Sequence, residues 1–160
     1  MGPSLDPKPA LDALSAASIL HSGSPVSQPQ IESLFDTLRP VDPPFLLGAW
    51  APGYVNVQSD AAQRTNDLLR GMRWAGKDFH SEDDVDALML WGDAGREAGG
   101  HKARLREIKS RGTVTTAMIY DDAPIIDTFK RVTDDLVLGM MDHKDEQYPR
   151  NYMFYLERLK

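Results

Sequence analysis

Residues 113–141 read TVTTAMIYDDAPIIDTFKRVTDDLVLGMM, three runs rich in β-branched and large apolar residues that short polar turns separate. Runs of this kind favour strands, and separators this short are typical of hairpins. Similar runs lie on both sides, so the sequence predicts five consecutive strands: Ala103–Lys109, Thr113–Tyr120, Ile125–Val132, Leu136–Met141 and Tyr152–Leu159. We therefore expect a mainly β protein of the α+β class, whose antiparallel meander closes into a small barrel or is covered by helices.

The clearest helix lies upstream of these strands, between Ser27 and Pro40. Ser27 and Gln30 have the spacing of a capping box, which marks a helix start. The apolar positions that follow recur at helical spacing: Ile31, Leu34, Phe35 and Leu38. Because only one face is apolar, we expect this helix to lie across the sheet.

The middle of the chain gives mixed signals. Phe45–Trp50 has the composition of a short strand, and Ser59 is placed to cap a helix that runs to Met72. Ser81 and Asp84 suggest another short helix, with three residues facing inward: Val85, Leu88 and Met89. The glycine-rich segment 92–101 predicts a mobile loop.

The N-terminal segment has little apolar periodicity and several prolines. We expect residues 1–26 to form a flexible arm with one short helix over Pro9–Leu20, and residues 27–160 to form a single domain. Deletion of this arm is then expected to leave the domain folded.

The composition excludes several classes of protein. The chain of 160 residues has no cysteine, which removes disulfides, thiolate catalysis and cysteine-based metal centres. Its net charge of −6 lacks the basic surface that nucleic-acid binding requires. No apolar run is long enough to cross a bilayer. We expect a cytoplasmic protein with no nucleic-acid or membrane partner, and a homodimer stays an open alternative.

The familiar motifs of metal, nucleotide and nucleophilic sites are missing. The four histidines are scattered, and a solvated acidic segment explains His80 beside Glu82, Asp83 and Asp84 better than a metal site does. There is no nucleophile elbow and no glycine-rich phosphate loop. The sequence therefore predicts a protein without metal or cofactor.

Asp127 is the most informative charged residue. It is in strand phase with Ile125 and Phe129, so all three side chains should face the same side of the sheet. If that side is the interior, two interpretations stay open. The carboxylate either forms an ion pair with Arg111, Lys130 or another cation, or it lies in an apolar cavity where it transfers a proton.

Other side chains complete a candidate ligand site. Tyr120, Lys77 and a protonated Asp127 are candidate hydrogen-bond donors. The candidate wall of the site consists of large apolar residues: Trp50, Trp74, Met118, Phe129 and Met140. Core packing explains most residues of this kind, but small barrels also hold apolar ligands with such side chains.

Two groups of motifs resemble the GXWXG proteins and the domain of unknown function that follows in that family. The first group is Gly48-Ala-Trp50 with Trp74-Ala-Gly76-Lys77-Asp-Phe79, and the second runs from Arg104 through Pro124-Ile-Ile-Asp127 to Arg158. The chain departs from the pattern at Gly53, which is displaced by one position, and at Thr128, where a histidine is usual. The resemblance implies a lipocalin-like barrel with a small-molecule cavity.

These observations lead to a hypothesis with two alternatives. The first reading is a cofactor-independent enzyme of specialised metabolism that cyclises or isomerises an apolar small molecule, for example by an intramolecular Diels–Alder-type reaction. The second is a non-catalytic carrier of a hydrophobic ligand. The third is a structural or partner-binding protein whose core is filled.

Overall fold

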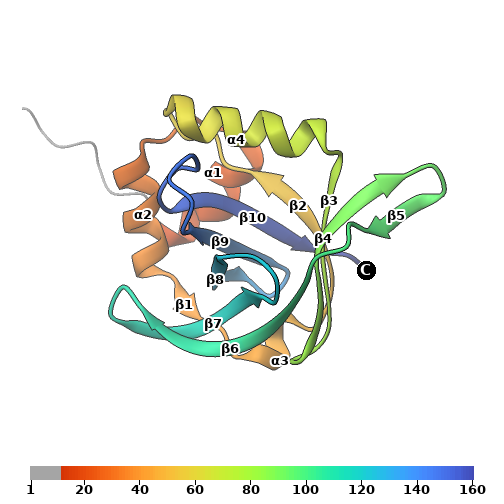
Figure 1. Ribbon diagram of the computed structural model, residues 1–160. Helices are drawn as coiled ribbons and strands as arrows, with labels where there is room; N and C mark the ends of the chain where they lie inside the picture. The colour runs from red at the N-terminus through yellow and green to blue at the C-terminus, as the bar shows by residue number, and fades with distance from the viewer. Residues whose placement is uncertain (1–11) are drawn as a thin grey trace, which may run out of the picture.

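The strands of the computed structural model, which describes residues 12–160, form one closed antiparallel barrel (Figure 1). Eight strands close it in the order β8-β7-β6-β4-β3-β2-β10-β9, and β9 pairs back onto β8. Their bounds are β2 (Gly48–Tyr54), β3 (Trp74–Ser81), β4 (Asp84–Gly92), β6 (Lys102–Ser110), β7 (Thr113–Tyr120), β8 (Ile125–Thr133), β9 (Leu136–His143) and β10 (Tyr152–Arg158). The predicted meander and its closure into a barrel are confirmed.

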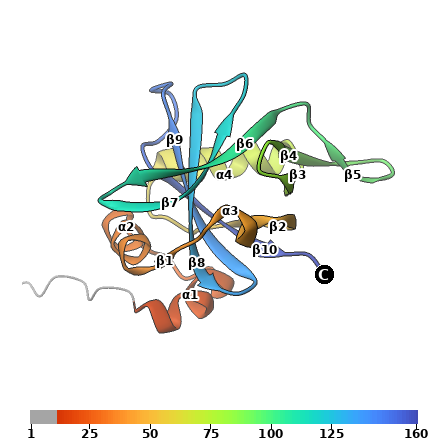
Figure 2. The same cartoon turned by 90° about the horizontal axis from the view of Figure 1, so that it is seen from below.

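Two short strands lie outside this ring. β1 (Arg39–Pro40) pairs with β8, and β5 (Gly95–Ala98) pairs with β4 alone. The β4–β5 hairpin projects from the barrel, as Figure 2 shows from below.

The helices cover one side and both ends of the barrel. A 3₁₀ turn (Ala13–Ser15) leads into α1 (Ala16–Ser22), and α1 and α2 (Gln28–Thr37) pack against the outer face of the sheet. α3 (Pro43–Leu46) and α4 (Asp60–Gly71) lie near opposite ends of the barrel (Figure 1). The predicted capping box starts α2. The Ser27 hydroxyl accepts a hydrogen bond from the backbone N–H of Gln30, and the Gln30 side chain accepts one from the backbone N–H of Ser27.

Strands β9 and β10 are buried on both faces and separate two hydrophobic cores. The barrel core, inside the ring, is built from Val41, Leu46, Trp50, Trp74, Phe79, Val85, Ala87, Ala103, Leu105, Met118, Phe129, Val137, Tyr152, Phe154 and Leu156. The outer core lies between the sheet and helices α1 and α2, and its largest members are Ile31, Leu34, Phe35, Leu138, Met140 and Met153.

Two of the sequence predictions in the middle of the chain are wrong. The segment after Ser81 is strand β4, not a helix, because its burial alternates with a period of two: Val85, Ala87 and Met89 are buried. The segment 92–101 is not simply a loop, since it contains β5 and the hairpin turn that joins β5 to β4.

The predicted strand Phe45–Trp50 is also only partly correct. Its first two residues belong to α3, which Asp42 caps by accepting a hydrogen bond from the Phe45 backbone N–H at 3.1 Å. The strand itself begins at Gly48. The helix predicted after Ser59 is confirmed as α4, with Ser59 as its N-cap, but it ends at Gly71, and Leu68 and the C-cap residue Met72 are exposed.

The N-terminal boundary needs a correction as well. Ala16 and Leu20 of α1 are buried in the outer core, so the packed domain begins before residue 27. The Asn56 side chain donates a hydrogen bond to the carbonyl of Gly23, which ties the end of α1 to the barrel. The start of the predicted helix Pro9–Leu20, and the arm up to residue 11, lie outside the described residues.

Within residues 12–160, no helix has the length and apolar character needed to cross a membrane.

Candidate functional site

Lys77 reaches the barrel interior through an irregularity in β3. Trp74 and Lys77 both face inward although they are three residues apart, which strict alternation forbids. The register of β3 against β4 shifts on both sides of Gly76, where φ is 104°. A Cβ at Gly76 would lie 1.8 Å from the carbonyl oxygen of Trp50, so the close approach of β2 and β3 requires glycine.

The Lys77 ammonium forms a buried ion pair with Asp127. Its Nζ lies 3.3 Å from Asp127 Oδ2 and donates a hydrogen bond of 2.8 Å to the carbonyl of Ala87. The two side chains are only 4% and 3% exposed. The rings of Trp74, Tyr120 and Phe154 surround the ammonium, with centroids 5.5–5.7 Å from Nζ, and stabilise its charge.

Asp127 faces the interior together with Phe129, and its cationic partner is neither of the two cations that the sequence suggested. Arg111 binds Asp36 of α2 on the outside of the barrel, and Lys130 lies beside Phe35 in the outer core. The second carboxylate oxygen, Oδ1, is buried and has no hydrogen-bond partner among residues 12–160. An unpartnered carboxylate oxygen in such a place is costly, and it is free to accept a hydrogen bond from a ligand.

Burial and charge shift the pKa values of this cluster. Burial raises the pKa of Asp127, and the neighbouring Lys77 only partly opposes that rise. Burial disfavours the Lys77 ammonium, but the attraction of Tyr120 and Asp127 outweighs it and holds the pKa of Lys77 above its usual value. Burial also raises the pKa of Tyr120, so its phenol stays protonated and can donate a hydrogen bond. The site therefore offers two donors and one acceptor in an apolar setting.

Four of the five predicted wall residues lie in the barrel core: Trp50, Trp74, Met118 and Phe129. Met140 does not, because it faces the outer core, and its neighbour Met141 packs against the barrel core instead. The sequence reasoning also missed Phe154, which contacts Trp74 and Phe129 edge to face at centroid distances of 5.7 and 5.9 Å.

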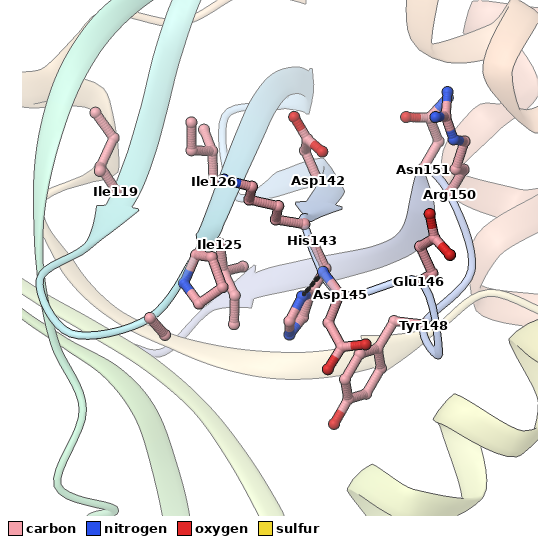
Figure 3. A pocket seen from close by; sticks show the side chains of 13 residues that line it. Ile119, Ile125, Ile126, Asp142, His143, Asp145, Glu146, Tyr148, Arg150 and Asn151 are labelled. Carbon is pink, nitrogen blue, oxygen red and sulfur yellow. Dashed lines mark hydrogen bonds between the residues drawn. The ribbon is translucent and has the colours of Figure 1, made fainter.

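A pocket of about 860 Å³ lies at the rim of the barrel, under the connection between β9 and β10 (Figure 3). We call it the rim pocket. One wall is apolar and comes from the ends of β7 and β8, and the other is polar and comes from the end of β9 and the following loop. Its lining comprises Ile119, Ala123, Pro124, Ile125, Ile126, Asp142, His143, Lys144, Asp145, Glu146, Tyr148, Arg150 and Asn151.

The rim pocket and the ion pair are neighbours along the same two strands. Ile125 pairs with His143, and the next inward-facing pair toward the centre of the barrel is Asp127 with Met141. Two residues along a strand span about 7 Å. Figure 3 shows Ile125 and His143 on one side of these strand ends and Ile126 on the other, so both faces of the sheet contribute to the lining of the pocket at the rim.

The histidines pair singly with carboxylates or stand apart. His80 binds Asp86 at 2.8 Å, and His101 lies 3.5 Å from Asp122. Within residues 12–160, no group of three or more histidine and acidic side chains is placed to hold a metal ion.

Comparisons with known proteins agree with this architecture. Two family models match the chain, "GXWXG protein" over residues 33–95 and "Domain of unknown function (DUF4334)" over residues 101–158. The crystal structure of a protein from Thermomonospora curvata superposes with a TM-score of 0.82 at 40% sequence identity. That match covers 94% of this chain and 100% of the other. No curated protein matches significantly.

Proposed function

The chain belongs to the GXWXG protein family, and we propose that it is a cofactor-independent enzyme of specialised metabolism that cyclises or isomerises an apolar small molecule. The observation that carries this proposal is the buried Lys77–Asp127 pair with its unpartnered carboxylate oxygen. A buried ion pair is often no more stabilising than an apolar pair of the same size. Titratable groups held in such a setting are typical of sites that bind or convert a ligand.

An isomerisation would use the pair as base and hydrogen-bond donor. The Asp127 carboxylate takes a proton from a carbon next to a carbonyl group, and the electron pair of that C–H bond moves into an enolate. The Lys77 ammonium and the Tyr120 hydroxyl donate hydrogen bonds to the enolate oxygen, where the charge develops. Asp127 then returns the proton to a different carbon, so that the double bond moves and no atoms are gained or lost.

A pericyclic cyclisation would use the same groups differently. No proton moves in such a reaction, and a hydrogen bond from Lys77 to a carbonyl conjugated with the dienophile activates it. The aromatic and thioether walls hold diene and dienophile in a reactive pose, which lowers the entropic part of the barrier. This form of the reaction depends more on Lys77 than on Asp127.

The rim pocket supports a ligand route to the pair. The barrel core is filled, with Trp50, Met118 and Phe129 fully buried, so a ligand would approach from the rim, pass His143 and displace Ile125. A non-catalytic carrier is the alternative, and the volume and apolar wall of the rim pocket favour it. A carrier would hold its ligand there without needing the ion pair.

The experiment uses two carbonyl probes. Cyclohex-3-enone becomes the conjugated cyclohex-2-enone on isomerisation, which is followed by ultraviolet absorbance, and a trienone with a tethered diene reports on cyclisation. We expect the wild-type protein to accelerate at least one reaction, with Asp127→Asn slowing the isomerisation about tenfold to a hundredfold and Lys77→Met slowing both reactions, since both use its hydrogen bond. Asp121→Asn, in the exposed β7–β8 turn, is the matched control and should change neither rate.

Two results would count against the enzyme. Wild-type protein that binds the probes and returns both unchanged is a carrier. Equal rates for the wild type, Asp127→Asn and Lys77→Met would mean that the pair takes no part in the chemistry.

A further inference from the structure

His143 stands between the rim pocket and the ion pair. It faces Ile125 across β8 and β9, in the inward layer next to that of Asp127 and Met141. The lining of the rim pocket includes His143 but neither Lys77 nor Asp127, so a ligand that extends from the pocket to the pair passes the His143 ring. The proposed chemistry at Lys77 and Asp127 makes no use of this residue.

The His143 ring is held in one orientation. Its Nδ1 accepts a hydrogen bond of 3.0 Å from the backbone N–H of Asp145. The ring stacks on Tyr148 with a centroid distance of 4.3 Å and an interplanar angle of 17°. Because Nδ1 acts as the acceptor, the hydrogen bond assigns the proton of the neutral ring to Nε2. Among residues 12–160, Nε2 has no hydrogen-bond partner, so this N–H is available to a ligand.

We infer that His143 is a second polar contact for the ligand, and that the ligand is an elongated apolar molecule with two oxygen functions. One oxygen function meets the Lys77–Asp127 pair, and the other accepts a hydrogen bond from His143 Nε2, about 7 Å closer to the rim. This inference rests on the proposed function, since it assumes that the ligand reaches the pair.

The two walls of the rim pocket agree with such a ligand. The apolar wall, where Pro124 and Ile125 lie beside His143, accommodates a hydrocarbon body. The polar wall carries His143 among charged groups of both signs, so a neutral oxygen function suits it better than a full charge.

The test compares two planar probes, 2-naphthol with one hydroxyl group and naphthalene-2,6-diol with hydroxyl groups at both ends. We expect the wild type to bind the diol about tenfold more tightly, the effect of one additional well-placed hydrogen bond. His143→Phe keeps an aromatic ring for stacking on Tyr148 but removes the Nε2–H donor. This variant should bind both probes with the affinity that the wild type has for 2-naphthol.

A matched control and two contrary outcomes complete the test. His80→Phe changes an exposed histidine on β3 and should preserve the preference for the diol. If His143→Phe keeps that preference, the inference fails while the proposed function stands. If Lys77→Met loses no affinity for either probe, or neither probe binds to the wild type, the ligand does not reach the pair, and the proposed function and the inference both fail.

Discussion

The barrel core and the outer core share strands β9 and β10, and each buries a lysine, but among residues 12–160 only the barrel core buries a carboxylate. The barrel core buries an ammonium and a carboxylate together and leaves one carboxylate oxygen without a partner. Beside the outer core, Asp36 and Arg111 stay partly exposed at the margin, where their side chains are 42% and 33% exposed. The difference teaches that the barrel core keeps a buried acid with one oxygen that no group among residues 12–160 satisfies, a cost that a bound ligand would offset.

The two carboxyl groups respond to pH in opposite directions. Burial raises the pKa of Asp127, so ionising it is harder in the folded than in the unfolded chain. Stability is therefore lost as the pH rises from 3.8 toward the raised pKa. The hydrogen bond from Arg111 lowers the pKa of Asp36, so this group contributes stability above pH 3.8 and loses it as the pH falls through its lowered pKa.

The largest expected effect on stability comes from the outer core. Phe35→Ala removes a fully buried ring between α2 and the sheet and should lower the free energy of unfolding by about 3–5 kcal/mol. Chemical denaturation measures this loss. The rate of cyclohexenone isomerisation per folded molecule should not change, because Phe35 lies outside the barrel. If Phe35→Ala has the same free energy of unfolding as the wild type, the outer core does not stabilise the protein as we expect.

Asp127→Asn, unlike Phe35→Ala, should lower the rate per folded molecule. We expect isomerisation to fall about tenfold to a hundredfold, since the amide cannot exchange a proton, while most of the hydrogen-bonding capacity stays. The same denaturation curves and rate assays apply. Stability should fall as well, because the buried Lys77 ammonium loses its partner. A purely structural ion pair predicts the same loss of stability with an unchanged rate per folded molecule.

The smallest effect is expected at the margin of the outer core. Asp36→Asn breaks a partly exposed pair with Arg111 and should cost less than about 1 kcal/mol near neutral pH, and less still at high salt. The difference from the wild type should vanish as the pH falls well below 3.8. A pH-independent difference in melting temperature would show that packing, and not charge, holds this contact.

The sequence predicts the C-terminal half of the fold well because its signals are local. Alternating residues and short turns mark β6 to β10 nearly to the residue. The phase of β9 is harder to predict, since the strand packs against both cores and is apolar on both faces. The sequence therefore predicts the wrong face for Met140.

The candidate site is only partly visible from the sequence for a different reason. Asp127 follows from its strand phase, but its pairing with Lys77 depends on closure of the ring between distant strands. The bulge at Gly76 also reverses the alternation in β3. A strict period of two would instead place Lys77 and Trp74 on opposite faces of the strand. The acidic segment before Val85 has the composition of a helix start, so the sequence does not predict β4. It therefore does not predict the Ala87 carbonyl that accepts a hydrogen bond from Lys77.

The central claim is that the Lys77–Asp127 pair serves a ligand and not the fold. The double variant Lys77→Met/Asp127→Leu replaces both charges with apolar side chains of similar size. Its free energy of unfolding, measured beside the isomerisation rate, should equal that of the wild type or exceed it by about 1–4 kcal/mol, while the rate falls at least about a hundredfold. A loss of several kcal/mol with the rate per folded molecule preserved would contradict the claim.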